Sequence, residues 1–219
     1  GSIWMGGDEG LFKLQNGRWA TVMRRKAEVM ALAETQGGKI LAGIFNSGIL
    51  IVDGAKRSYS NTSNGLPSNK VQCLWYSNNQ PDELWIGTQD AGVARGDMRE
   101  NRFTQITENQ GLCNRNVRSI LADGWGRVAW FGTSGGGLCK YAAQDFEQLT
   151  MEDGLRSNFV YSLCNDAGGI WLSAGDRGIS FWDVMADTLV HFGAENGFAN
   201  VKCRAMHKDR YNRIWVGTE

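Results

Sequence analysis

Short runs of alternating apolar and polar residues recur along the whole chain, separated by glycine, asparagine, aspartate or serine. Alternation is typical of strands with one buried face, because successive side chains of a strand point to opposite faces of its sheet. Four kinds of run follow in a fixed order, here named A to D, as in VRSILAD (117–123), VAWFGT (128–133), GGLCKY (136–141) and FEQLT (146–150). Residues 24–34 could pass for a short helix, but they match the register of the A runs. We therefore predict an all-β fold.

The four runs form a unit that repeats along the chain. The aromatic position of the B run is filled, in order, by Trp4, Leu41, Trp85, Trp130, Trp171 and Trp215. The spacings between these positions are 37, 44, 45, 41 and 44 residues. A unit of about 40–45 residues with four strands is typical of a β-propeller blade. We predict that residues 1–219 form one repeat region of four-stranded antiparallel blades, about five blades' worth.

Residue size suggests how the strands of a blade are ordered. The third residue of the A run is small in every unit: Ala31, Cys73, Ser119, Ser162 and Ala205. Strands next to a propeller axis are crowded, so the A strand is expected to be the inner one. The B-run tryptophan suits the wider part of the wedge between neighbouring sheets, where burying the ring contributes roughly 2–3 kcal/mol.

Charge and hydropathy exclude several classes of protein. Lys plus Arg and Asp plus Glu both number 23, so the formal net charge is zero. This balance argues against nucleic-acid binding and against a polybasic membrane-surface protein. No stretch approaches 18 consecutive apolar residues, and the N-terminus shows no signal-peptide pattern. The 29 glycines and nine tryptophans agree with many short strands joined by tight turns.

The five cysteines are Cys73, Cys113, Cys139, Cys164 and Cys203. An odd number cannot be paired completely within one chain, and no spacing is typical of a zinc site. We interpret most of them as small core residues, which leaves the redox compartment open.

Two kinds of loop invite a chemical interpretation. Asp123, Asp166 and Asp209 each lie in a loop between runs A and B, where a carboxylate can accept hydrogen bonds from backbone N–H groups of a turn. Calcium would need six to eight oxygen ligands, so we predict turns and no metal. The glycine-rich stretch 132–138 lacks the Gly-Lys-Ser/Thr ending of a phosphate-binding loop. It is predicted to be a hairpin between runs B and C.

The turns between runs D and A are the best candidates for a ligand site, because they should meet at one face of a rigid scaffold. They vary most within the repeat, over 67–70, 113–116, 156–159 and 199–202, and the second A-run residue varies beside them. The residues predicted to contact a ligand are Gln72, Arg115, Arg118, Arg156, Tyr161, Lys202 and Arg204. Arginine suits carboxylates, phosphates or sugar hydroxyls. The alternative is that these residues form salt bridges between blades and cap turns.

Several of these stretches resemble two-component regulator propeller repeats. The segments that carry the resemblance are NGLPSNKV (64–71), ELWIGT (83–88), RFTQIT (102–107), DGLRSNFV (153–160) and YSLCND (161–166). The resemblance implies an extracytoplasmic, periplasmic sensor region of a bacterial histidine kinase or diguanylate cyclase, tethered to the membrane outside this chain. It also implies a ring of about seven blades, so the chain is expected to be an arc of a larger propeller.

The function that we predict is a non-catalytic sensor that binds a small ligand such as a carbohydrate, without a cofactor. One alternative is an interaction scaffold: an open arc would expose strand edges at 2–6 and 213–219, which favours self-association as a dimer. Another is a propeller-fold lyase, because IWVGTE (214–219) is similar to a strand of streptogramin-inactivating enzymes. The two histidines, His191 and His207, lie at non-equivalent positions and predict no catalytic triad.

Overall fold

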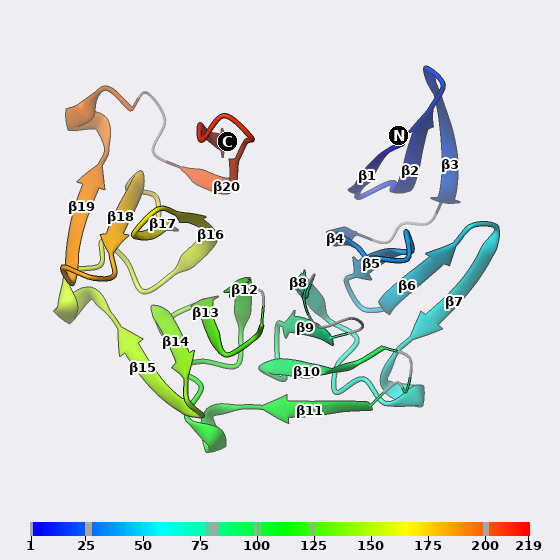
Figure 1. Ribbon diagram of the computed structural model, residues 1–219, viewed down its shortest axis with the longest axis horizontal. Coiled ribbons are helices and arrows are strands. Elements are labelled where there is room, and N and C mark those ends of the chain that lie inside the picture. Colours follow the sequence, from blue (N-terminus) through cyan, green and yellow to red (C-terminus); the bar gives the residue numbers. More distant parts are fainter. Residues whose placement is uncertain are drawn as a thin grey trace. The chain divides into compact units, whose positions relative to one another are not determined.

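The computed structural model describes residues 2–24, 28–77, 79, 83–98, 100, 102–123, 125–198 and 202–219. Over these residues the chain forms β-strands and four short 3-10 helices, with no α-helix (Figure 1). No helix within these ranges is long and apolar enough to cross a bilayer. The chain divides into two compact units, Gly1–Ile106 and Thr107–Glu219. Each unit has its own sheets.

The first unit contains three antiparallel sheets. The first has three strands, β1 (Ile3–Gly7), β2 (Gly10–Gln15) and β3 (Arg18–Arg24). The second has four, β4 (Val29–Glu34), β5 (Ile40–Ile44), β6 (Gly48–Asp53) and β7 (Lys56–Ser60). The third follows the 3-10 helix η1 (Thr62–Asn64) and consists of β8 (Val71–Tyr76), β9 (Glu83–Thr88), β10 (Val93–Asp97) and β11 (Arg102–Ile106). Strands β4 and β8 of successive sheets lie side by side.

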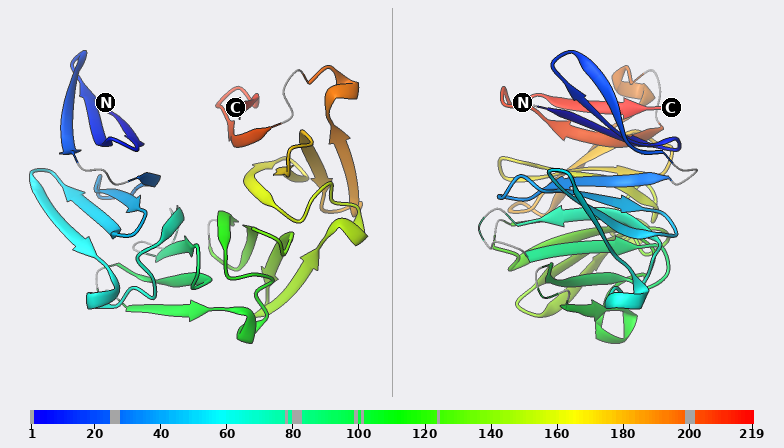
Figure 2. Two further views of the ribbon diagram at one scale, coloured as in Figure 1. Left: turned by 180° about the vertical axis from the view of Figure 1, so that it is seen from behind. Right: turned by 90° about the vertical axis from the view of Figure 1, so that its right-hand side faces the viewer.

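The second unit also contains three antiparallel sheets. After η2 (Glu108–Gln110) come β12 (Val117–Ala122), β13 (Val128–Thr133), β14 (Leu138–Ala142) and β15 (Asp145–Leu149). After η3 (Met151–Asp153) come β16 (Val160–Asp166), β17 (Gly169–Ala174), β18 (Ile179–Asp183) and β19 (Thr188–Phe192). After η4 (Ala194–Asn196) come β20 (Cys203–Lys208) and β21 (Ile214–Thr218). Strands β12, β16 and β20 are neighbours in that order, and the sheets stack face to face (Figure 2).

The strand order confirms the repeat predicted from the sequence. Each four-stranded sheet runs A, B, C, D from one edge to the other, the three-stranded sheet runs B, C, D, and the two-stranded sheet is A, B. Residues 29–34 form a strand, as predicted, while residues 25–27 lie outside the described ranges. The fold is therefore all-β, built from mainly four-stranded antiparallel sheets like the blades of a propeller. The blade count and the arc of a larger ring stay predictions.

The glycine of the B strand explains part of the repeated motif. A Cβ atom built on Gly6 would lie 2.4 Å from Cγ1 of Val29, the first residue of the next A strand. The same construction on Gly43 would meet Val71 Cγ1 at 2.7 Å. In the second unit, Gly132 would meet Val160 Cγ1 at 2.8 Å. Glycine is therefore required for successive sheets to pack closely, since side-chain atoms cannot approach to these distances.

The B-strand tryptophans do not share one environment. Trp85 is fully buried, whereas Trp215 is 57% exposed on the two-stranded sheet. The expectation that this side chain is buried therefore holds for Trp85 and not for Trp215.

The aspartates of the A-to-B loops form turns, as predicted. The Asp209 carboxylate accepts hydrogen bonds from the backbone N–H groups of Tyr211 and Arg213, and from the indole N–H of Trp215 at 2.9 Å. The Trp215 hydrogen bond is the main reason that the pKa of Asp209 falls to about 2. The glycine-rich stretch 132–138 is the predicted hairpin, closed by Thr133 N–H and hydroxyl groups that donate to Gly137 O.

The structure corrects the interpretation of two cysteines. Cys113 and Cys139 form a disulfide with a Cα–Cα distance of 5.7 Å. The turn before β12 carries Cys113 to β14, so residues that are 26 apart in the sequence become neighbours. Cys164 and Cys203 are free and buried, and burial raises the pKa of the Cys73 thiol to about 12. These three fit the predicted role of small core residues.

Candidate functional site

A β-bulge occurs at the second residue of each of the five A strands, β4, β8, β12, β16 and β20. The register skips Met30, Gln72, Arg118, Tyr161 and Arg204. A bulge leaves one residue out of the strand pairing and re-aims its side chain, and bulges are frequent beside functional sites. The variable position that the sequence singles out is therefore also distinct in its backbone.

In the second unit, three bulged residues come together. The guanidinium carbon of Arg204 lies 4.4 Å from the centre of the Tyr161 ring, and that of Arg118 lies 5.8 Å from it. These distances fit cation–π contacts. Because β12, β16 and β20 are adjacent, three separate sheets contribute to this group, which we call the Arg–Tyr cluster (Arg118, Tyr161 and Arg204).

Arg204 is neutralised by two carboxylates, Asp176 and Glu219, that no sequence pattern predicts. Its Nε lies 2.7 Å from Glu219 Oε1, and its Nη2 lies 3.6 Å from Asp176 Oδ1 in the turn between β17 and β18. The hydrogen bond to Arg204 is the main reason that the pKa of Glu219 is lowered. Lys202 also pairs with Glu219, at 3.6 Å. The side chains of Lys202 and Arg204 thus share one counter-ion.

Arg118 differs from Arg204. Its Nε donates a hydrogen bond to Ser134 Oγ at 2.6 Å. Over the described residues no carboxylate lies within ion-pair distance of Arg118. Its two terminal nitrogens donate no hydrogen bond to any other acceptor of these residues. Phe159, 49% exposed, lies next to this position because it forms a β-bridge with Ser134. Arg118 can therefore offer a bidentate pair of donors to a ligand.

Arg115 and Arg156, in the turns that precede β12 and β16, both have protein partners. The backbone N–H and the Nε of Arg115 both donate to Glu108 Oε1, at 2.8 and 3.1 Å. Arg156 pairs with Glu195 and donates to the backbone carbonyl of Arg177 at 2.9 Å. These contacts correspond to the alternative interpretation of turn caps and salt bridges between sheets, and a ligand role for either residue stays a prediction.

In the first unit, Gln72 is buried with 8% of its surface exposed, and the Arg–Tyr cluster does not include it. The variable turn 67–70 does line a pocket of about 500 Å³ together with Asp90. Asp90 accepts a hydrogen bond from Ser68 and pairs with Lys70 at 2.9 Å, so the polar groups of this pocket are held in place. Residues 199–201 of the last variable turn lie outside the described ranges.

One serine–histidine pair bears on the catalytic alternative. Ser180 Oγ and His191 Nδ1 are 2.7 Å apart across the paired strands β18 and β19. Ser180 is only 1% exposed, so its hydroxyl cannot reach a substrate. Burial, and then the charge of Arg156, lower the pKa of His191. Within the described residues, no group of three or more His, Cys, Asp or Glu side chains is placed to hold a metal ion.

No protein-family model and no curated protein matches this sequence. Solved structures do match. One is the extracellular domain of the hybrid two-component system BT3049 of B. thetaiotaomicron, with a TM-score of 0.84 and 24% identity over 99% of this chain and 30% of that one. Another is the extracellular domain of BT4673, a hybrid two-component system of the same organism, with a TM-score of 0.60 and 13% identity over 99% of this chain and 44% of that one.

A third match is the computationally designed protein Ika8, with a TM-score of 0.68 and 15% identity over 99% of this chain and 65% of that one. At these identities the likeness shows the fold alone. The chain spans less than half the length of the two B. thetaiotaomicron domains. Both of those neighbours are extracellular domains of two-component systems, which agrees with the sequence resemblance to two-component regulator propellers.

Proposed function

We propose that the chain is part of a non-catalytic, extracytoplasmic sensor of a bacterial signal-transduction protein, and that the Arg–Tyr cluster binds a small ligand such as a carbohydrate. The sensor role is supported by the two neighbours that are extracellular domains of two-component systems. An extracytoplasmic location is supported by the Cys113–Cys139 disulfide, since such bonds persist mainly in oxidising compartments.

The observation that carries the ligand site is the position of Arg118. Its terminal nitrogens have no protein acceptor in the described residues, yet they lie beside the ring of Tyr161 at a bulged position. The guanidinium would donate to a carboxylate or to hydroxyl groups. The Tyr161 ring, which is partly buried, would pack against the face of a sugar.

The placement of the cluster suggests how binding would be transmitted. Arg118, Tyr161 and Arg204 come from β12, β16 and β20, which belong to three successive sheets. A ligand that contacts all three would favour one packing of these sheets over others. It can shift that equilibrium only by its difference in affinity for the alternative arrangements.

A thermal-shift screen of the 219-residue chain tests this proposal. Neutral and uronic-acid oligosaccharides are added singly, and a ligand is expected to raise the melting temperature by mass action. Arg118→Gln is expected to abolish the shift. The matched control is Arg127→Gln, an exposed arginine of the same unit that pairs with Asp123 in an A-to-B loop. The ligand site is wrong if Arg118→Gln leaves the shift unchanged or if both variants reduce it equally.

A second candidate function is an interaction scaffold. Over the described residues, β1 pairs only with β2 and β21 only with β20, so each is an edge strand. Ile3 and Trp215 on these strands are 62% and 57% exposed. Exposed edges with apolar side chains favour pairing between chains. Light scattering is expected to show a dimer that Trp215→Lys disrupts, and a monomer at high concentration would rule out self-association.

A further inference from the structure

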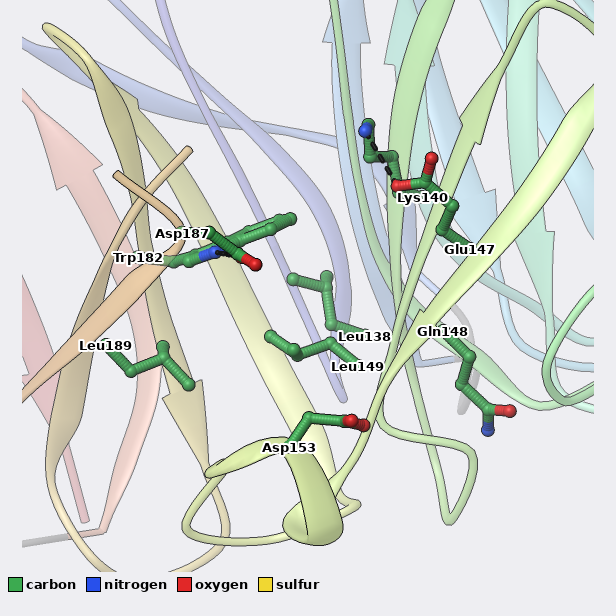
Figure 3. A pocket seen from close by; sticks show the side chains of 9 residues that line it. All are labelled: Leu138, Lys140, Glu147, Gln148, Leu149, Asp153, Trp182, Asp187 and Leu189. Atoms are coloured by element: carbon green, nitrogen blue, oxygen red, sulfur yellow. Dashed lines mark hydrogen bonds and ion pairs between the residues drawn. The ribbon is translucent and has the colours of Figure 1, made fainter. Parts of the chain in front are cut away.

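A pocket of about 380 Å³ lies between the outer strands of two neighbouring sheets in the second unit (Figure 3). One wall comes from β14, β15 and η3, and the other comes from β18, β19 and the turn that joins them. The half-buried Leu149 and Leu189 give the pocket its apolar middle, while Leu138 and Trp182 line it with 1% and 7% of their surface exposed. Its volume lies within the range of about 300–1,000 Å³ that is usual for small-molecule sites.

Two aspartates border this apolar middle from opposite sides. Asp187 belongs to the turn between β18 and β19, whereas Asp153 belongs to η3, which follows β15 at the other end of the strands. Figure 3 shows the two carboxylates on either side of Leu138 and Leu149. The pocket is therefore apolar in the middle and anionic at both ends.

The charges that line the pocket do not cancel. Lys140 contributes +1, while Glu147, Asp153 and Asp187 contribute −3, which gives −2 in total. Lys140 Nζ is paired with Glu147 Oε2 at 2.8 Å, so these two charges neutralise each other at the rim. The uncompensated charge belongs to Asp153 and Asp187.

Both aspartates are oriented by hydrogen bonds that use one carboxylate oxygen only. Asp153 Oδ2 accepts from the backbone N–H and the hydroxyl of Thr150, at 2.8 and 2.9 Å. Asp187 Oδ1 accepts from the indole N–H of Trp182 at 3.2 Å. The other oxygen of each carboxylate has no donor among the described residues. The backbone N–H of Thr150 is the main reason that the pKa of Asp153 is lowered, so this group stays ionised in mild acid.

We propose that this pocket binds an aliphatic diamine, with one ammonium group at Asp153, the other at Asp187, and the methylene chain over the half-buried Leu149 and Leu189. A ligand with two positive charges balances the charge of −2, and its apolar middle matches the apolar middle of the pocket. A monoamine would leave one carboxylate unpaired, and a diol would leave both. The site is separate from the Arg–Tyr cluster and does not depend on its function.

The test is a titration of the 219-residue chain with butane-, hexane- and octane-diamine, followed by the NMR signals of ¹³C-labelled leucine methyl groups. Shifts are expected at Leu138, Leu149 and Leu189 and should saturate. The best diamine is expected to bind about threefold to tenfold more tightly than hexylamine, since each exposed ion pair contributes a modest amount. Hexane-1,6-diol should bind more weakly still, and added salt should weaken the diamine most.

Charge-neutral variants locate the contacts. Asp153→Asn and Asp187→Asn keep an oxygen for the Thr150 and Trp182 hydrogen bonds, and asparagine tolerates the positive φ of 51° at position 187. Each variant is expected to bring diamine affinity down to that of hexylamine. The matched control is Glu152→Gln, which removes a charge from η3 outside the pocket. The proposal is overturned if hexane-1,6-diol binds as tightly as the diamine, if Glu152→Gln weakens binding equally, or if no leucine methyl shifts.

Discussion

The turns before β12 and β16, residues 107–116 and 150–159, share one frame but are fastened differently. Each begins with a threonine that caps a 3-10 helix, Thr107 or Thr150, followed by a glycine with φ of 104°, Gly111 or Gly154. Each glycine is followed by a leucine with 2–3% of its surface exposed. These features are local, because each residue acts on neighbours within a few positions.

The difference lies two residues after the glycine. The first turn has Cys113 there, bonded covalently to Cys139 on β14. The second has Arg156, which pairs with Glu195 and donates to the Arg177 carbonyl. In both turns the residue at this position contacts a partner distant in sequence, but the contact is a disulfide in the first turn and an ion pair with a hydrogen bond in the second. Two units of the repeat therefore share the local conformation of the turn but differ in the interaction that attaches the turn to a neighbouring strand or sheet.

Loss of the disulfide is expected to be the largest effect. Reduction, or the double change Cys113→Ser with Cys139→Ser, should lower the free energy of unfolding by about 3 kcal/mol, because the bond restricts the unfolded chain between residues 26 apart. Urea unfolding with and without reductant measures this. Reductant should leave the urea midpoint of the double variant unchanged. If reduction also leaves the midpoint of the unsubstituted protein unchanged, the disulfide does not stabilise the first turn as expected.

The glycines are expected to come next. Gly111→Ala should cost about 2 kcal/mol and Gly154→Ala about 1 kcal/mol, because alanine is disfavoured at positive φ. The larger value belongs to Gly111 because its Cβ would lie 3.0 Å from Phe146 Cδ2, whereas the Cβ on Gly154 would lie 3.6 Å from Leu189 Cδ1. Thermal unfolding of both variants checks which substitution costs more stability. A larger loss for Gly154→Ala would show that the two turns pack differently from what their glycine contacts indicate.

The threonine caps should matter less. Thr107→Ala and Thr150→Ala are each expected to cost about 0.5–1 kcal/mol, because each hydroxyl accepts a backbone hydrogen bond from the residue two positions later. Equal losses in urea unfolding would support a common frame. Serine at either position, which keeps the hydroxyl, serves as the control and should restore most of the loss.

The smallest effect should be the pH dependence of the Arg156–Glu195 pair. The hydrogen bond from Arg156 is the main reason that the pKa of Glu195 lies below its ordinary value of 4.5. A lowered folded-state pKa contributes stability above pH 4.5, and this contribution is lost as pH falls through the folded value. Arg156→Gln should therefore lower the melting temperature slightly at pH 7, and the difference should shrink as pH falls below 4.5. A difference that stays constant into acid would assign the role of Arg156 to its hydrogen bond with the Arg177 carbonyl instead.

Much of the fold could be predicted because it depends on patterns among residues close together in the sequence. The alternation and spacing gave the strand order, and aspartate positions such as Asp209 gave the turns. Burial could not be predicted from the motif, since Trp85 and Trp215 occupy equivalent positions of the repeat, yet Trp85 is fully buried and Trp215 is 57% exposed. The 3-10 helices were missed because their three-residue length shows no periodicity.

The candidate site was predictable in part. Variability within the repeat singled out Arg118, Tyr161 and Arg204, which the structure brings together. The partners of Arg204, Asp176 and Glu219, come from a hairpin turn and from the residue after β21, and no repeat spacing connects them to it. The disulfide could not be predicted for the same reason, because Cys113 and Cys139 are 26 residues apart and become neighbours only through the path of the turn before β12.

The contact between a B-strand glycine and the next A-strand valine has an evolutionary consequence. It recurs as Gly6 with Val29, Gly43 with Val71, and Gly132 with Val160. The sheet from β4 to β7 supplies the valine of one such contact, Val29, and the glycine of the next, Gly43. Its two faces therefore make complementary halves of the same type of contact. A gene segment that encodes one such sheet could be duplicated or deleted without redesign of the joints. Chains of this kind can change length in whole sheets while junctions of this glycine–valine type keep the same fit.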